Sequence, residues 1–244
     1  MTDLHSHLLY DFDDGAVNRD ESLRMLEIYA ESGYDTVTAS SHSDLSKKTE
    51  YAEKFADLAD LAGTMGITLV EGAEYSLNDL LASYPDSLPE KSMFLLLDLG
   101  VFPVDAALVN KLMPLAAMKK RILFAHPERL WGSGVLKRIE TLSMLPGSAY
   151  QVNAGSLLGV YGKESYLGAW KMLTSGKCHA IASDAHNHDG VKFLQDARKM
   201  LKKFIEPEAI EIFFDLNPRL IASGSSPRWH MIKLSWLQKL KLGL

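Results

Sequence analysis

Side chains that commonly bind metal ions recur at the ends of successive apolar runs in this chain. Imidazoles and carboxylates have little structural use at so many strand ends, because they add nothing to a packed core. In an alternating β/α protein the carboxyl ends of parallel strands meet at one mouth, where active sites are built. We therefore predict one multinuclear metal centre. Its candidate ligands are His5, His7, Asp14, His42, Glu74, Asp98, His126, Asp184 and His186.

Two pairs of these candidates share a two-residue spacing. His5 and His7 point to the same face of an extended strand, so they can bind one ion or two neighbouring ions. Asp184 and His186 repeat the spacing after another apolar run. Each pair alone also fits two ordinary polar residues at a strand end, so the recurrence along the chain carries the prediction.

The remaining candidates are single residues, and each has an alternative explanation. A lone loop histidine such as His42 or His126 is more often a surface residue than a ligand, but both follow predicted strands at matching positions. Glu71 is an alternative ligand to Glu74, or a residue that caps the loop. Because the set offers nitrogen and oxygen only, manganese, iron or zinc is favoured over magnesium.

Two other phosphatase chemistries are disfavoured by the residues around their nucleophiles. Cys178 is the single cysteine, which excludes an internal disulfide and a thiolate metal cluster. No arginine follows Cys178 to close a phosphate loop of the cysteine-dependent type. Asp11 and Asp13 resemble the D-x-D motif of aspartate-nucleophile phosphatases, but the apolar strand that should precede that motif is missing.

Short apolar runs alternate with amphipathic patterns along the chain, which predicts an α/β fold. The predicted strands are residues 1–7, 36–39, 67–70, 93–97, 121–125, 149–152 and 179–182. The predicted helices are residues 21–32, 49–65, 105–118, 165–174 and 191–204. This order predicts a distorted, seven-stranded β/α barrel of the TIM type.

Length and charge narrow the class of protein. The 244 residues, 47% of them hydrophobic, predict one domain over residues 1–244. A net charge of -5 argues against a nucleic-acid partner, which would call for a basic face. We find no secretion signal and no apolar run long enough to span a bilayer, so we expect a cytoplasmic protein.

The motifs together resemble the polymerase and histidinol phosphatase (PHP) superfamily and, within it, the bacterial tyrosine-protein phosphatases of capsule and exopolysaccharide operons. They extend in order over residues 1–218. The matching segments are D-L-H-S-H at 3–7, D-D-G at 13–15, E-S at 21–22, S-H at 41–42, G-A-E at 72–74, A-H-P-E-R at 125–129, Q-V-N-A-G-S at 151–156, G-V-Y-G at 159–162 and S-D-A-H-N at 183–187.

The resemblance implies a PHP-type barrel that holds three metal ions, usually manganese, with iron or zinc as alternatives. It implies hydrolysis of phosphotyrosine on a protein, without a covalent enzyme intermediate, and a membrane-tethered tyrosine kinase as the phosphoprotein partner. Arg129 would then stabilise the charge on the phosphoryl oxygens, although a surface salt bridge is its ordinary alternative. His188 is the candidate to assist the departing phenolate.

The chain departs from the family pattern at three places. Ser43 stands where the family has the second of two consecutive histidines, and Asp98 stands where it has a glutamate with one more methylene. The arginine that the family places beyond S-D-A-H-N is missing, which leaves Arg129, with His188 or Lys192, to hold phosphate. Two alternatives follow: a phosphatase for a small metabolite such as histidinol phosphate, and a binding module whose catalytic site is silenced.

Residues 228–244 contain several cations, two tryptophans and no acids. This composition predicts a basic amphipathic tail or helix. The apolar residues recur at core-like spacing, which favours a final helix packed on the barrel. The alternative is a peripheral contact with the inner face of the membrane.

Overall fold

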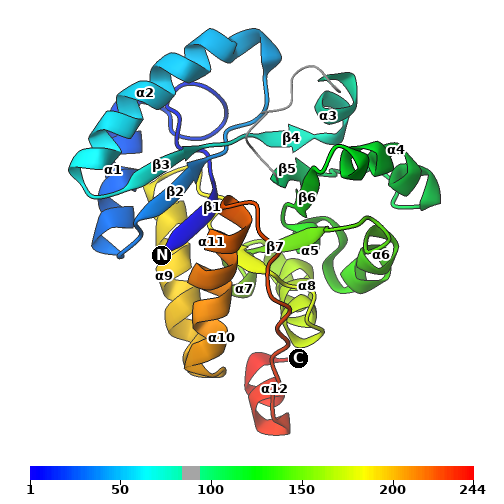
Figure 1. The fold of residues 1–244 in the computed structure, drawn as a ribbon. Helices are drawn as coiled ribbons and strands as arrows, with labels where there is room; N and C mark the ends of the chain where they lie inside the picture. The colour runs from blue at the N-terminus through cyan, green and yellow to red at the C-terminus, as the bar shows by residue number, and fades with distance from the viewer. Residues whose placement is uncertain (84–93) are drawn as a thin grey trace.

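The computed structural model describes residues 1–83 and 94–244, in which parallel strands lie between layers of helices (Figure 1). Every strand pairing among these residues is parallel. This arrangement confirms the predicted α/β fold. The strands are β1 (Thr2–Ser6), β2 (Thr36–Ala39), β3 (Thr68–Glu71), β4 (Glu74–Ser76), β5 (Phe94–Asp98), β6 (Arg121–Phe124), β7 (Ala149–Asn153) and β8 (Ala180–Ala182).

The predicted seven-stranded barrel is not confirmed, because the described strands form two sheets in the order β1-β2-β3 and β4-β5-β6-β7-β8. Only Gly72 and Ala73 separate β3, which pairs with β2, from β4, which pairs with β5. The chain thus passes from one sheet to the other at Gly72. A larger residue would not fit there, because an added Cβ would lie 2.5 Å from Thr38 Cγ2. A three-residue strand such as β4 is too short to carry a readable pattern. The predicted strand 93–97 matches β5, although Met93 lies outside the described residues.

The five predicted helices are confirmed as α1, α2, α4, α8 and α9. Asn18, Asp105 and Asn187 cap three of them, each accepting a hydrogen bond from a backbone N–H in the first turn. Their bounds are α1 (Arg19–Glu31), α2 (Lys48–Thr64), α4 (Ala106–Ala117), α8 (Gly162–Thr174) and α9 (His188–Leu201).

Several short helices had no readable periodicity, because three to eight residues complete too few turns. They are α3 (Leu77–Ser83), α5 (Pro127–Trp131), α6 (Val135–Leu142), α7 (Ala154–Leu157), α10 (Pro207–Glu211), α11 (Asn217–Ala222), the 3₁₀ turns η1 (Leu45–Lys47) and η2 (Gly132–Gly134), and the π-helical η3 (Ile212–Leu216). The last helix is α12 (Trp236–Leu242).

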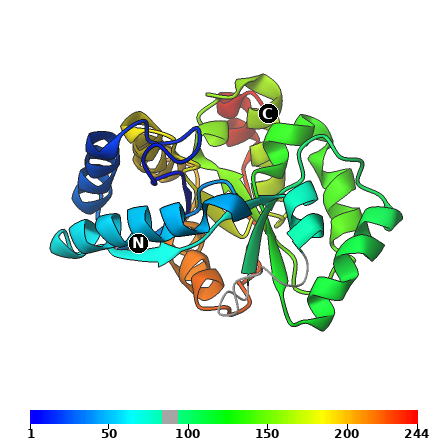
Figure 2. The same cartoon turned by 90° about the horizontal axis from the view of Figure 1, so that it is seen from above.

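The main hydrophobic core extends from Leu8 to Ile232 and joins the strands to the surrounding helices. A smaller apolar cluster, which includes Leu4, Leu96 and Leu123, lies inside the strand layer. Seen from above, helices flank the strands on both sides (Figure 2). Within residues 1–83 and 94–244, none of the helices has the length and apolar character needed to cross a membrane.

Candidate metal centre

The ends of β1 and β8 bring the two predicted ligand pairs face to face. The backbone N–H of Asp184 donates to the carbonyl oxygen of His5 over 2.9 Å. The N–H of His7 donates to the carbonyl oxygen of Ala185, also over 2.9 Å. His5 lies within β1 and His7 just beyond it, so the pair with two-residue spacing opposes the segment that follows β8.

A single bridge between the two sheets adds the next two candidates. His42 and Glu74 are bridge partners, and the N–H of Ser43 donates to the carbonyl oxygen of Glu74 over 2.9 Å. The site therefore lies where the sheets meet. Glu71, the alternative ligand, is exposed at the end of β3, whereas Glu74 is 2% exposed.

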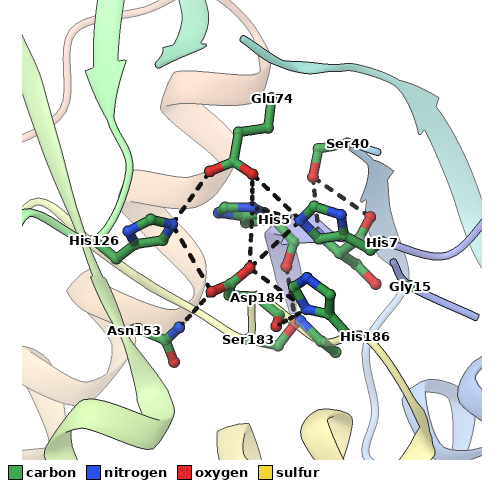
Figure 3. Close-up of polar contacts among 12 residues, drawn as sticks. His5, His7, Gly15, Ser40, Glu74, His126, Asn153, Ser183, Asp184 and His186 are labelled. Atoms are coloured by element: carbon green, nitrogen blue, oxygen red, sulfur yellow. Dashed lines mark hydrogen bonds and ion pairs between the residues drawn. The ribbon is translucent and has the colours of Figure 1, made fainter. Parts of the chain in front are cut away.

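The buried part of the site is built from five side chains whose polar atoms face one another (Figure 3). The Nε2 atoms of His5 and His7 are 3.2 Å apart, and each lies 3.4 Å from Glu74 Oε2. Asp184 Oδ1 lies 3.3 Å from His5 Nε2 and 3.5 Å from His7 Nε2. His126 Nε2 lies 3.2 Å from the other oxygen of Glu74.

The open part of the site faces solvent. Asp14 Oδ1 lies 3.3 Å from His42 Nε2 and 3.4 Å from His186 Nε2, and the Asp14 side chain is 67% exposed. Eight of the nine candidates thus come together. Their ligand atoms form three groups, each within 4.8 Å, which are His7, Asp14, His42 and His186; His5, His7 and Asp184; and His5, Glu74 and His126.

The structure leaves Asp98 and His188 outside these groups. Asp98 ends β5 and accepts a hydrogen bond from the N–H of Gly100 over 2.8 Å, while its charge helps to raise the pKa of His126. His188 begins α9, and its Nδ1 lies 2.8 Å from Glu21 Oε1. The shorter aspartate side chain accounts for the first placement, because a glutamate at position 98 would reach farther from the strand.

Two side chains that we did not predict as site residues orient the histidines. Asp13 Oδ2 lies 2.8 Å from His7 Nδ1 and accepts a hydrogen bond from the N–H of His42. Gln151 lies 3.1 to 3.3 Å from His5 Nδ1. With Nδ1 occupied in this way, each ring turns its Nε2 toward the cluster, as metal-binding histidines usually do. Their places in the D-D-G and Q-V-N-A-G-S segments were the signals that could have identified them.

The backbone adopts the left-handed conformation at two of the clustered residues. His126 has a φ of 30° and Asp184 a φ of 53°. Such a backbone costs on the order of 1–3 kcal/mol at a residue with a side chain, and it concentrates at functional sites. The rest of the fold therefore stabilises a geometry that the local chain disfavours.

The charges in the site are strongly coupled. Burial raises the pKa of Glu74, but the charge of His5 and hydrogen bonds from His126, His5 and His7 bring it well below its usual value. Burial lowers the pKa of His126, but the hydrogen bond to Glu74 and the charge of Asp184 raise it to about 9. Burial likewise opposes a charge on His7, whose carboxylate partners nevertheless raise its pKa well above the usual range. The buried cluster therefore favours ionised carboxylates and a positive charge between them.

These residues fit divalent metal ions. His5 and His7 turn their Nε2 atoms toward each other at 3.2 Å, so two protonated rings would oppose like charges and N–H groups. A divalent cation shared by imidazole nitrogens and carboxylate oxygens satisfies all of these atoms together. The donor set, free of sulfur, suits manganese, iron or zinc.

A cationic side chain lies at the edge of the same cluster. The Arg129 guanidinium donates to Asp184 Oδ2, to which Asn153 Nδ2 also donates over 2.8 Å. The guanidinium carbon lies 4.4 Å from the centroid of the Tyr161 ring. Gly155 makes room for that ring, since an added Cβ would lie 2.6 Å from a Tyr161 ring carbon. A fixed, planar guanidinium at the mouth of a metal site is suited to binding a phosphoryl group.

A model of the family "Capsular polysaccharide synthesis, CpsB/CapC" matches residues 1–222. The chain is 27% identical to the tyrosine-protein phosphatase CpsB of Streptococcus pneumoniae, over 91% of this chain and 98% of that protein. It is 24% identical to the putative tyrosine-protein phosphatase CapC of Staphylococcus aureus, over 92% of this chain and 89% of that protein.

The fold is also similar to a solved structure. It matches a chain from a crystallographic study of YwqE from Bacillus subtilis and CpsB from Streptococcus pneumoniae, described there as unique metal-dependent tyrosine phosphatases. The TM-score is 0.78 at 21% identity, and the match covers 96% of this chain and 99% of that chain. At this identity the likeness concerns the fold.

Proposed function

The chain belongs to the CpsB/CapC family of capsular polysaccharide synthesis, and on that premise we propose that it is a metal-dependent phosphatase that hydrolyses phosphotyrosine on proteins. The observation that carries the proposal is the convergence of three groups of metal-type ligands with Arg129 at one mouth. A membrane-spanning or nucleic-acid-binding role would not require buried carboxylates and imidazoles in this arrangement.

The ligand groups and Arg129 have different roles in phosphoryl transfer. The three groups would hold metal ions, and bound ions would supply an activated water and positive charge for attack on phosphorus. Asp13 and Gln151 hold the rings of His7 and His5 so that their Nε2 atoms remain directed at that site. Arg129 pairs with the equatorial oxygens of the phosphoryl group, where charge stabilisation matters most in this reaction.

We assign manganese as the metal and three as the number of ions, with iron and zinc as alternatives. The number is supported by the three groups of ligand atoms, of which two share His5 and two share His7. Shared ligands suit closely spaced ions. The identity is supported by the donor set of imidazole and carboxylate. We also assign Asp98 to the cluster, because its charge helps to raise the pKa of His126. We place His188 at the side of the mouth that His186, two residues earlier, lines.

We assign a tyrosine kinase tethered to the membrane as the phosphoprotein partner. The assignment rests on the capsular synthesis family and on the open, exposed side of the cluster at Asp14 and His42, which admits a side chain carried by a protein. The enzyme would then act in the cytoplasm, peripheral to the inner face of the membrane, as a single domain of residues 1–244.

A substrate comparison with a metal-loaded protein tests the function. The purified protein, reconstituted with Mn²⁺, should hydrolyse a phosphotyrosine peptide much faster than histidinol phosphate, and chelation with EDTA should abolish turnover. The His7→Ala and Asp184→Ala variants should lose both bound metal and turnover. Faster hydrolysis of histidinol phosphate would indicate a small-metabolite phosphatase. A folded wild-type protein that binds no metal and turns over neither substrate would be a binding module instead.

A further inference from the structure

The last helix turns its most apolar face away from the protein. At about 100° per residue, Trp236, Leu237 and Leu240 fall within one arc of α12 of about 100°. Their side chains are 72%, 60% and 63% exposed. An ordinary surface helix of a globular protein does the opposite, burying its apolar stripe and exposing its polar one.

The polar contacts of α12 lie on its inner side, so its orientation is determined. Gln238 Nε2 donates to the carbonyl oxygen of Phe204 over 2.8 Å, and the Tyr166 hydroxyl donates to the carbonyl oxygen of Leu242 over the same distance. Ser235 and Gln238 form a capping box that begins the helix. Ahead of it, Ile232 is 4% exposed and its N–H donates to the carbonyl oxygen of Leu173. The outward apolar face is therefore presented by a docked helix, not by a loose tail.

Cations flank the outward face on both sides. Lys239 and Lys241 lie about 60° and 40° beyond the two edges of the apolar arc, and both are exposed. Further exposed lysines lie in the adjoining segments at positions 202, 203 and 233. In the part of the chain that the structure describes, none of these five lysines forms an ion pair. Residues 228–244 contain no acid that would offset them.

We propose that this outward face of α12, defined by Trp236, Leu237 and Leu240 with Lys239 and Lys241, binds the surface of an anionic lipid bilayer. Apolar side chains enter the headgroup boundary while flanking lysines meet the lipid phosphates, which is how interfacial helices bind. Tryptophan favours that boundary. A second copy of this chain fits less well, because a symmetric contact would oppose lysines to lysines and involve far fewer than the roughly 20 residues a side of a stable interface.

The outward face of α12 is separate from the metal centre. Helix α9 begins at His188, beside the metal centre, and runs about 21 Å toward Phe204, whose carbonyl oxygen contacts α12. Trp229, in the segment ahead of α12, packs on His179 just before β8, with ring centroids 4.4 Å apart. None of the residues that form the outward face lines the metal centre. Contact through α12 therefore leaves the metal centre open to a phosphotyrosine on a segment that extends from the membrane.

Vesicle co-sedimentation of the full-length protein tests this inference, which adds the contact surface to the proposed location. Vesicles of phosphatidylcholine with phosphatidylglycerol should bind the protein, whereas vesicles of phosphatidylcholine alone should bind it at least about tenfold more weakly. Combined Trp236→Ala and Leu240→Ala substitutions, and separately Lys239→Glu with Lys241→Glu, should each reduce binding to the anionic vesicles by at least about tenfold.

Matched substitutions elsewhere provide the controls. Met144→Ala removes another exposed apolar side chain, and Lys111→Glu with Lys137→Glu reverses two exposed lysines far from α12; both should leave vesicle binding unchanged. All variants should hydrolyse a soluble phosphotyrosine peptide at the wild-type rate, so failure of lipid binding is distinct from failure of the proposed activity. Equal sedimentation with both kinds of vesicle would overturn the inference. A dimer that Trp236→Ala dissociates, without lipid binding, would assign the face to a second copy.

Discussion

The guanidinium of Arg129 stacks on the ring of Tyr161, with the guanidinium carbon 4.4 Å from the ring centroid. The same guanidinium donates to Asp184, so a ring on one side and a carboxylate on the other determine its orientation. Gly155 leaves space for the ring of Tyr161, because a side chain at position 155 would collide with it. The orientation of the cation that we propose to bind phosphate thus depends on the G-V-Y-G segment as well as on the H-P-E-R segment.

Removal of the Tyr161 ring should impair catalysis, whereas removal of its hydroxyl should not. We expect Tyr161→Leu to lower kcat/KM for a phosphotyrosine peptide by about fivefold to tenfold, since a cation–π contact contributes about 0.5–2 kcal/mol. Tyr161→Phe keeps the ring and should remain within about twofold of wild type. Bound metal and Tm should be unchanged in both. Equal losses in the two variants would assign the effect to the hydroxyl.

Arg129→Lys should lower kcat/KM by at least about tenfold, or about 1.4 kcal/mol in the transition state. Lysine keeps the charge but loses the planar fork and its bidentate geometry. Thermal denaturation should give a Tm close to wild type, because the new ammonium still neutralises Asp184. A variant with an unaltered rate constant and normal folding would remove Arg129 from the phosphate site.

Asp98→Glu should strengthen metal binding. The added methylene allows the carboxylate to extend from the end of β5 toward His126, whose pKa the charge of Asp98 already helps to raise. We expect about a tenfold lower Kd for Mn²⁺ in a competition titration with a chelator. Asp98→Asn, which has the size of aspartate and no charge, should not strengthen binding. A glutamate variant that binds Mn²⁺ no tighter than wild type would place position 98 outside the cluster.

Asp13→Asn should weaken metal binding by about tenfold to a hundredfold, although Asp13 is in none of the three ligand groups. The carboxylate holds His7 through Nδ1 and also accepts from the backbone of His42. Asp11→Asn is a matched control on the same loop, because asparagine tolerates the left-handed backbone found there, at a φ of 49°. Equal Mn²⁺ affinity in the two variants would contradict the orienting role of Asp13.

Acid should destabilise the fold through His179. Burial, and then the charge of Lys177, lower the pKa of this histidine to about 4. The unfolded chain, with a histidine pKa of about 6.5, therefore binds a proton that the folded chain refuses between pH 6.5 and 4. The contribution of neutral His179 to the free energy of unfolding is complete above pH 6.5. It falls by roughly 3 kcal/mol as the pH drops through that window, at about 1.4 kcal/mol for each pH unit.

The matched variant for this pH dependence is His179→Gln, which can still accept the hydrogen bond from the N–H of Tyr150. Urea denaturation of both proteins at several pH values gives the difference in unfolding free energy, in which acid effects on the metal centre cancel. The advantage of wild type over the variant should shrink between pH 6.5 and 4. A constant difference would show that His179 is protonated equally in the folded and unfolded chains.

The sequence alone determined the alternation of strands and long helices and most of the metal-type residues. Both could be predicted because they are local properties. Parallel strands and long helices have readable periodicity, and ligands at the shared mouth usually follow a strand end, as His7, His126 and Asp184 do. The family motifs added the expectation of a phosphatase, which the family match and its named members support.

Only the tertiary structure decided which side chains meet. Gln151 orients His5 across the fold, and Asp13 joins the nearby His7 to the backbone of the distant His42. The change of sheets at Gly72 depends on packing against Thr38. The tertiary structure likewise decided which way α12 turns its apolar face. Its apolar spacing fits a buried helix as well as an exposed one, because periodicity defines a face but not the neighbour that the face contacts. The contacts of Gln238 and Leu242 settle that direction, leaving the apolar face outward.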